Sequence, residues 1–133
     1  MKVLIDTPIW SYALRSDNEE FVAYVNEFQN LLKNQRVIII GPIRQELLSG
    51  YSDIKKFEKL NEKLSYFDNS PILDIDYVEA AKFSNICRAN GIIGSHIDYL
   101  ICAVAVRIEV EIFTTDKYFN NYARYLPLDL YKF

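Results

Sequence analysis

The feature that most constrains the fold is a repeated pattern in which a short apolar run leads directly into a helix start. Residues 3–5 (Val-Leu-Ile) precede Thr7-Pro8, and residues 37–40 (Val-Ile-Ile-Ile) precede Gly41-Pro42. Continuous runs of β-branched residues are typical of strands buried on both faces, and proline is favoured at the first helical position. We therefore expect two buried strands that each lead into a helix, with Thr7 as the N-cap of the first helix.

The same alternation continues to the end of the chain. Further strands are expected at residues 72–75, 111–114 and 128–131. The expected helices cover residues 8–15, 18–33, 42–49, 53–66, 76 to the Asn90-Gly91 stop, 96–108 and 117–123. Strands that alternate with helices form a parallel sheet with right-handed crossovers. The sequence thus predicts a single α/β domain (residues 1–133) with three α/β/α layers and a central, mainly parallel sheet of four to five strands.

Composition narrows the functional classes. Half of the residues are hydrophobic, and the net charge of −3 argues against a surface that attracts nucleic acid as a whole, although it does not exclude a local basic rim. Cys87 and Cys102 lie in apolar helical segments without metal-type spacing, so we interpret them as reduced core residues of a cytoplasmic protein. The longest apolar run, residues 99–106, is too short to span a membrane, and no signal peptide pattern is visible.

Four acidic residues occupy unusual positions in this pattern. Asp6 and Asp116 directly follow strands, Glu46 borders the buried face one turn into a helix, and Asp98 begins the most apolar helix. The carboxyl ends of parallel strands form the edge where ligands bind in such sheets. Carboxylates that converge there would repel one another and raise one another's pKa values unless a cation neutralised them. Their oxygens suit Mg²⁺ or Mn²⁺.

Each acid alone has a simpler interpretation. Asp6 or Asp116 could be a helix N-cap, Glu46 a surface acid, and Asp98 a charge that favours the helix dipole at its amino end. The convergence of all four on one edge of the sheet is what favours a functional site.

The motif pieces around these acids resemble those of the PIN domain, and most of all the small bacterial toxin ribonucleases of the VapC group. The matching pieces run from the first strand to the fourth and together cover essentially the whole chain. They are Leu4-Ile5-Asp6-Thr7 with Trp10, Ile43-Arg44-Gln45-Glu46-Leu47 with Gly50, residues 97–105 around Asp98, and Thr114-Thr115-Asp116-Lys117-Tyr118-Phe119.

The resemblance implies an acidic site that binds one or two Mg²⁺ (or Mn²⁺) ions and hydrolyses RNA phosphodiester bonds. Its residues would be Asp6, Glu46, Asp98 and Asp116, with Thr115 as a hydroxyl beside the last acid. Tyr118 departs from the family, because many relatives carry a further acid or a histidine there, which leaves the second metal position open. The resemblance also implies an antitoxin partner and a homodimer.

Cations near the acids would hold the phosphates of an RNA substrate. Arg44 and Lys117 are closest in sequence to the acids, and Arg15 is a weaker candidate. His96, the only histidine, is interpreted as a capping or surface residue.

Two other functional classes stay open at this stage. A phosphoryl-receiving α/β domain would use an aspartate after the third strand, where Asp74 and Asp76 lie, but the lysine expected after the last strand is missing. An inactive PIN-like scaffold that only binds a partner is the other alternative, although such a scaffold would have no reason to tolerate four mutually repelling acids.

Overall fold

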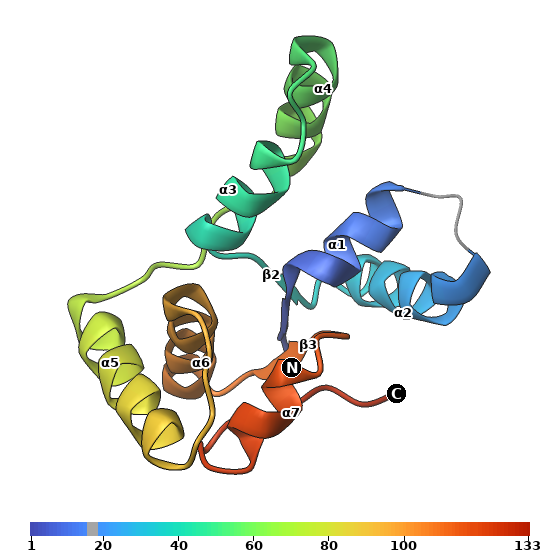
Figure 1. Ribbon diagram of the computed structural model, residues 1–133. Coiled ribbons are helices and arrows are strands. Elements are labelled where there is room, and N and C mark those ends of the chain that lie inside the picture. Colours follow the sequence, from blue (N-terminus) through green and yellow to red (C-terminus); the bar gives the residue numbers. More distant parts are fainter. Residues whose placement is uncertain (16–18) are drawn as a thin grey trace.

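The computed structural model describes residues 1–15 and 19–133 and shows an α/β fold around a small parallel sheet (Figure 1). Within the described residues the sheet has three strands, β1 (Val3–Ile5), β2 (Val37–Ile38) and β3 (Glu111–Phe113), in the order β2-β1-β3. Both pairings are parallel, and Leu4 lies opposite Ile38 on one side and Ile112 on the other. All residues of β1 are fully buried, as expected for a central strand covered on both faces.

Helices surround this sheet. They are α1 (Thr7–Leu14), the 3₁₀ turn η1 (Glu19–Phe21), α2 (Val22–Lys33), α3 (Gly41–Ser49), α4 (Ile54–Leu64), α5 (Asp74–Ala89), α6 (His96–Ile108) and α7 (Tyr118–Ala123). Helices α1 and α2 lie on one side of the sheet and α5 and α6 on the other, which confirms the layered α/β/α arrangement (Figure 1). The predicted helix at residues 96–108 is confirmed. The predicted helix start at residue 18 lies outside the described residues.

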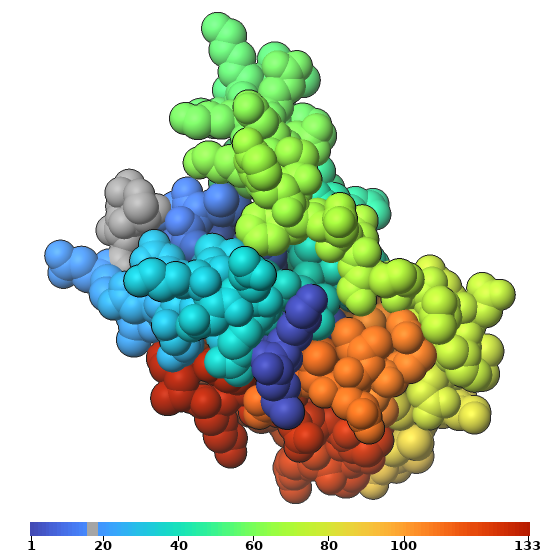
Figure 2. All heavy atoms as spheres, turned by 180° about the vertical axis from the view of Figure 1, so that it is seen from behind, coloured from blue at the N-terminus to red at the C-terminus, as the bar shows by residue number. Residues whose placement is uncertain are grey.

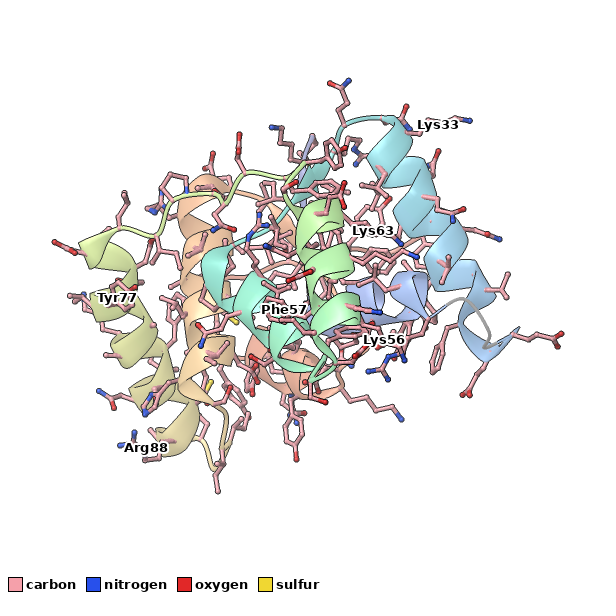
Figure 3. The ribbon with its side chains drawn as sticks, turned by 90° about the horizontal axis from the view of Figure 1, so that it is seen from above. Lys33, Lys56, Phe57, Lys63, Tyr77 and Arg88 are labelled. Atoms are coloured by element: carbon pink, nitrogen blue, oxygen red, sulfur yellow. The ribbon has the colours of Figure 1, made fainter. Side chains whose placement is uncertain are left out.

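Helices α3 and α4 stand apart from these layers. Figure 2 shows α4 projecting from the rest of the molecule. The Arg44 guanidinium connects α3 to the end of α4 and the segment after it. It donates to Asn69 Oδ1 at 2.9 Å, to the Leu64 carbonyl at 2.8 Å and to the Phe67 carbonyl. Lys56 and Lys63 lie on one exposed side of α4 (Figure 3).

The predicted strand at residues 72–75 is wrong, because α5 already begins at Asp74. The buried Asp76 carboxylate accepts a hydrogen bond from the Leu73 backbone N–H at 2.8 Å and so closes the first helical turn. Leu73 and Ile75 are exposed rather than buried. The segment beside β2 comes earlier in the chain, where Asn69 forms an isolated parallel bridge with Ile39.

The predicted strand at residues 128–131 is also wrong, since it is reduced to a single parallel bridge between Ile112 and Leu130. The described sheet therefore has three strands instead of four to five.

The predicted N-cap of α1 is also wrong. Asp6, not Thr7, has the extended cap conformation and accepts a hydrogen bond from the Thr7 N–H.

The core fixes the turn between β1 and α1. Trp10 is 2% exposed, and its indole N–H donates to the Ile5 carbonyl at 3.1 Å. Its ring packs edge-on against Phe28 of α2 and against Phe67, with centroid distances of 4.9 and 5.2 Å. The residues on either side of Asp6 are therefore held rigidly.

No helix in the described ranges is both long and apolar enough to cross a membrane.

Candidate active site

Asp6 lies at the centre of the candidate site, at the carboxyl end of the central strand. Its side chain is almost completely buried, and both carboxylate oxygens accept hydrogen bonds. Oδ1 accepts from the Thr7 backbone N–H and Oδ2 from the Thr114 hydroxyl, both at 2.8 Å. The Thr114 bond joins the end of β1 to the segment that follows β3.

The ionised form of Asp6 is disfavoured in this position. Burial raises the pKa of Asp6 to about 6, although the hydrogen bonds from Thr114 and Thr7 work in the opposite direction. The charges of Asp98 and Glu46 also contribute to this raised pKa. These two acids, which lie far away in the sequence, are therefore close enough to Asp6 to repel its charge.

Asp98 approaches from the first turn of α6 and is half-buried. Its Oδ2 accepts a 2.7 Å hydrogen bond from the Tyr122 hydroxyl, and its backbone N–H donates to the Oγ of the N-cap residue Ser95 at 3.0 Å. Burial raises the pKa of Asp98, the hydrogen bonds lower it, and the charge of Asp116 raises it again. Asp98 thus interacts electrostatically with both Asp6 and Asp116.

Glu46 reaches the site from α3 but is more exposed than the sequence suggested. We expected it to border the buried face, whereas the residue is exposed and its Oε2 accepts a 3.1 Å hydrogen bond from the Thr7 hydroxyl. Glu46 and Asp98 line a shared pocket of about 390 Å³, together with Pro42, Gln45, Ser49, Ser95 and Ile97. This pocket is an open route from solvent to two of the four acids.

Asp116 lies in the segment between β3 and α7. Its backbone N–H donates to the Thr114 hydroxyl at 3.0 Å, and its Oδ1 accepts from the Tyr118 backbone N–H at 3.0 Å. The Thr114 hydroxyl therefore links the Asp6 carboxylate to the backbone of Asp116. The Thr115 hydroxyl lies 2.8 Å from the Tyr12 hydroxyl, so it is held by α1.

The four acids gather at one edge of the sheet, but their oxygens do not form a ready coordination shell. Among the described residues, no group of three or more His, Cys, Asp or Glu side chains is arranged so that it could hold a metal ion. The donor chemistry nevertheless fits Mg²⁺ or Mn²⁺, since all four groups are carboxylates. A divalent cation would also favour the ionised form of Asp6, which burial and the neighbouring acids disfavour.

The predicted phosphate-binding cations divide into two groups. Lys117 and Arg15 are exposed, directly before α7 and after α1. The guanidinium of Arg44 instead donates from all three nitrogens to residues 64–69, so it is already engaged within the protein and is a poor candidate for binding phosphate. His96 is exposed at the first position of α6, where Ser95 rather than His96 provides the cap.

The alternative of a phosphoryl-receiving domain requires a strand at residues 72–75, and the structure has none there because α5 begins at Asp74. Asp74 is exposed, and Asp76 is buried in an ion pair with Arg107 at 2.7 Å. Arg107 belongs to the last turn of α6, whereas Asp98 belongs to the first. Asp76 is therefore a structural acid at the opposite end of α6 from the candidate site.

Sequence reasoning missed the hydroxyl groups that hold the acids. Thr7, Thr114 and Tyr122 each donate to one of the four carboxylates. Thr7 and Thr114 lie within two residues of an acid, which is a usable signal. Tyr122 lies 24 residues from Asp98, and no sequence spacing points to that contact.

Comparisons with solved structures identify the fold. A VapBC2 complex from Rickettsia felis bound to a DNA fragment from its promoter matches with a TM-score of 0.78 and 21% identity, over 100% of this chain and 99% of that chain. FitAcB from Neisseria gonorrhoeae matches with a TM-score of 0.78 and 20% identity, over 98% and 96%. A toxin–antitoxin complex from Klebsiella pneumoniae matches with a TM-score of 0.60 and 20% identity, over 87% and 88%.

A comparison with curated protein sequences gave no significant match. The comparison with protein families did, since residues 3–125 match the PIN domain, a span that holds β1–β3, α1–α7 and all four acids. This chain belongs to the PIN domain family.

Proposed function

We propose that this protein is a metal-dependent endoribonuclease and the toxin of a type II toxin–antitoxin pair. The observation that carries the proposal is the Asp6 carboxylate, which is buried at the carboxyl edge of the sheet and repelled by Asp98 and Glu46. A fold gains no stability from such a cluster, so its cost is best explained by a function. Membership of the PIN domain family and the fold shared with toxin–antitoxin proteins support this choice.

The proposed metal-holding residues are Asp6 and Asp98, with Glu46 and Asp116 as additional or outer ligands. A bound Mg²⁺ or Mn²⁺ would supply a Lewis acid that polarises the phosphodiester and lowers the pKa of a coordinated water. Thr114 and Thr7 hold Asp6 at a fixed position, and Tyr122 does the same for Asp98. Glu46, which is exposed and lines the open pocket, would orient the attacking water and accept its proton.

The remaining groups of the site would bind the RNA backbone. Lys117 directly follows Asp116 in the chain, and its exposed ammonium group can pair with a phosphate. Arg15 can do the same from the end of α1. A net charge of −3 and an acidic centre make such local cations necessary for RNA to approach.

RNA cleavage by the purified protein tests this proposal. Mixed RNAs would be incubated with the chain in Mg²⁺, Mn²⁺ or EDTA, after any co-purified partner has been removed under denaturing conditions and the chain refolded. We expect internal cleavage with either metal and none in EDTA. Asp6→Asn and Asp98→Asn should each lower the cleavage rate by at least about 100-fold, because each removes a charge that the metal requires.

The matched control is Glu58→Gln, which makes the same type of change on the exposed face of α4 and should cleave normally. Cleavage that survives EDTA, or that Asp6→Asn retains, would contradict the proposed mechanism. A refolded chain that cleaves no RNA with any metal would favour the inactive scaffold.

The proposed partners are a small antitoxin and a second copy of this chain. The antitoxin proposal rests on the Klebsiella pneumoniae toxin–antitoxin complex, which shares this fold. The homodimer proposal rests on the outer surface of α5, where Ile75, Tyr77, Val78 and Ile86 are each more than 40% exposed. Tyr77 and Arg88 mark the two ends of this helix in Figure 3. Exposed apolar side chains gathered on one helix can mark a protein interface, and here the exposed Glu79–Lys82 ion pair separates Val78 from Ile86.

A further inference from the structure

One buried hydroxyl group donates a hydrogen bond directly to Asp98. Tyr122 of α7 is fully buried, and its hydroxyl donates to Asp98 Oδ2 at 2.7 Å. Asp98 is itself half-buried and repelled by Asp116. The Tyr122 bond occupies Oδ2, and among the described residues no side-chain hydroxyl donates to Oδ1.

The packing around the Tyr122 ring prevents this hydroxyl from moving away. The ring lies 5.1 Å from the ring of Tyr99 and 5.2 Å from that of Phe119, measured between centroids, and both neighbours are buried. Burial and the bond to Asp98 raise the pKa of Tyr122, so its hydroxyl remains protonated as a donor.

Gly94 closes the pocket around the two tyrosine hydroxyls. A methyl group at this position would lie 2.5 Å from the Tyr122 hydroxyl oxygen and 2.6 Å from that of Tyr99. A Cβ atom cannot lie closer than about 3.0 Å to such a neighbour unless something shifts, and the Tyr99 ring carbon, 2.7 Å from the same position, hinders that shift. The absence of a side chain at residue 94 is therefore what allows Tyr122 to reach Asp98.

We infer that Tyr122 is a positioning residue for Asp98 and that Gly94 provides the space its hydroxyl needs. This inference deepens the proposed function, because it rests on Asp98 acting as a metal-holding carboxylate. Tyr122 does not touch the reacting atoms. It fixes Asp98 Oδ2 and leaves Oδ1 as the oxygen that can bind a metal ion. Groups that orient a metal ligand in this way typically change affinity or activity 10- to 100-fold when removed.

Tyr122→Phe and Tyr99→Phe form a matched pair for the test. Each removes one buried hydroxyl beside Gly94, but only the Tyr122 hydroxyl contacts Asp98. We expect Tyr122→Phe to weaken Mn²⁺ binding, measured by calorimetry, and RNA cleavage by about 10- to 100-fold. Tyr99→Phe should change both by less than about twofold, and raised Mg²⁺ should restore part of the Tyr122→Phe activity.

Gly94→Ala tests the second part of the inference without removing a hydroxyl. It should lower Mn²⁺ affinity about as much as Tyr122→Phe, and the double variant should bind little more weakly than either single variant, because both act on one contact. Additive losses would contradict the shared role.

A crystal structure of Tyr122→Phe separates failure of the inference from failure of the proposed function. The Asp98 side chain should leave its wild-type rotamer whether or not the protein cleaves RNA. An unchanged Asp98 rotamer, or equal losses in Tyr99→Phe and Tyr122→Phe, would overturn the inference even if wild-type cleavage is confirmed. A wild-type chain that cleaves no RNA while Tyr122→Phe still releases Asp98 would overturn the proposed function alone.

Discussion

Asp6 combines a structural role with a cost. As the N-cap of α1 it accepts the Thr7 N–H, which stabilises the helix start. A partly exposed aspartate would provide the same cap without the penalty of burial. At 5% exposure, Asp6 instead has its pKa raised to about 6, first by desolvation and then by neighbouring acids. The cap therefore explains why a polar residue occurs here but not why it is so deeply buried.

The raised pKa of Asp6 predicts a pH-dependent instability of the metal-free protein. Because the folded-state pKa of about 6 exceeds the ordinary value of 3.8, the ionised carboxylate favours the unfolded state. This group therefore lowers the free energy of unfolding as the pH rises from about 4 through 6, by up to about 3 kcal/mol at pH 7.5. Asp6→Asn, measured in urea and EDTA, should be about 1–3 kcal/mol more stable than wild type at pH 7.5 and similar at pH 4.

Glu58→Gln, an exposed acid on α4, is the control and should change stability by less than about 0.5 kcal/mol at either pH. Millimolar Mg²⁺ should stabilise wild type more than Asp6→Asn, since a cation bound only by the native state raises its stability. A less stable Asp6→Asn variant at pH 7.5 in EDTA would show that the hydrogen bonds of Asp6 outweigh the cost of its charge.

The position of Asp6 and Asp116 at one edge of the sheet could be predicted from the sequence, but the hydroxyl groups that donate to the carboxylates could not. Asp6 and Asp116 follow strands, and the edge at which parallel strands end is fixed by topology. The Tyr122 hydroxyl reaches Asp98 only because α6 and α7 pack with Gly94 between two tyrosine rings. Such a contact depends on distances between elements, which a residue pattern does not encode.

At the scale of single elements, the start of α5 illustrates how an apolar run can mislead. Residues 72–75 contain two isoleucines and a leucine, and they follow a turn signal, as a strand would. Asp76 decides the outcome, because its carboxylate bonds to the Leu73 N–H and pairs with Arg107 on α6. The long-range ion pair selects the helix start, and local propensity is overridden. By contrast, α6 is buried along most of its length, and its continuous apolar pattern predicted both of its ends.

The Asp76–Arg107 pair predicts a loss of stability at low pH. Burial alone would raise the pKa of Asp76, but the hydrogen bonds from Arg107 and Leu73 and the Arg107 charge lower it overall. Its contribution is therefore complete above the ordinary pKa of 3.8 and is lost as the pH falls through the lower folded-state pKa. Asp76→Asn should lower the free energy of unfolding by about 2 kcal/mol at pH 7, with a smaller difference at pH 3.

Asp74→Asn provides the comparison for this measurement, because Asp74 is an exposed acid on the same helical turn. It should change stability at pH 7 by less than about 0.5 kcal/mol. If Asp76→Asn were as stable as wild type at pH 7, the ion pair would not be what anchors α5 to α6.

At the scale of the whole molecule, the acidic site, the exposed lysines of α4 and the exposed apolar residues of α5 lie on different parts of the surface. The acids meet at the edge where β1 and β3 end, and the projecting α4 carries exposed lysines away from the sheet (Figures 1 and 3). Helix α5 packs against α6, and its outer surface carries exposed apolar side chains beside the exposed Glu79–Lys82 ion pair. A pocket of about 370 Å³ lies between α5 and the start of α6, and Ile97 lines both this pocket and the one that holds Glu46 and Asp98. Of the exposed apolar residues of α5, Ile75 and Val78 flank Asp76, which lies at the opposite end of α6 from the acidic site.

This arrangement predicts that disrupting the α5 surface separates a homodimer into monomers. Val78 is 52% exposed in the middle of that surface, so Val78→Glu would bury a charge at the interface while leaving the monomer fold intact. Val22→Glu is the matched control, because Val22 is 47% exposed at the start of α2 on the other side of the sheet. Light scattering after size exclusion should give the dimer mass for wild type and Val22→Glu and the monomer mass for Val78→Glu. A wild-type monomer at micromolar concentration, or a Val78→Glu dimer, would mean that α5 is not the homodimer interface.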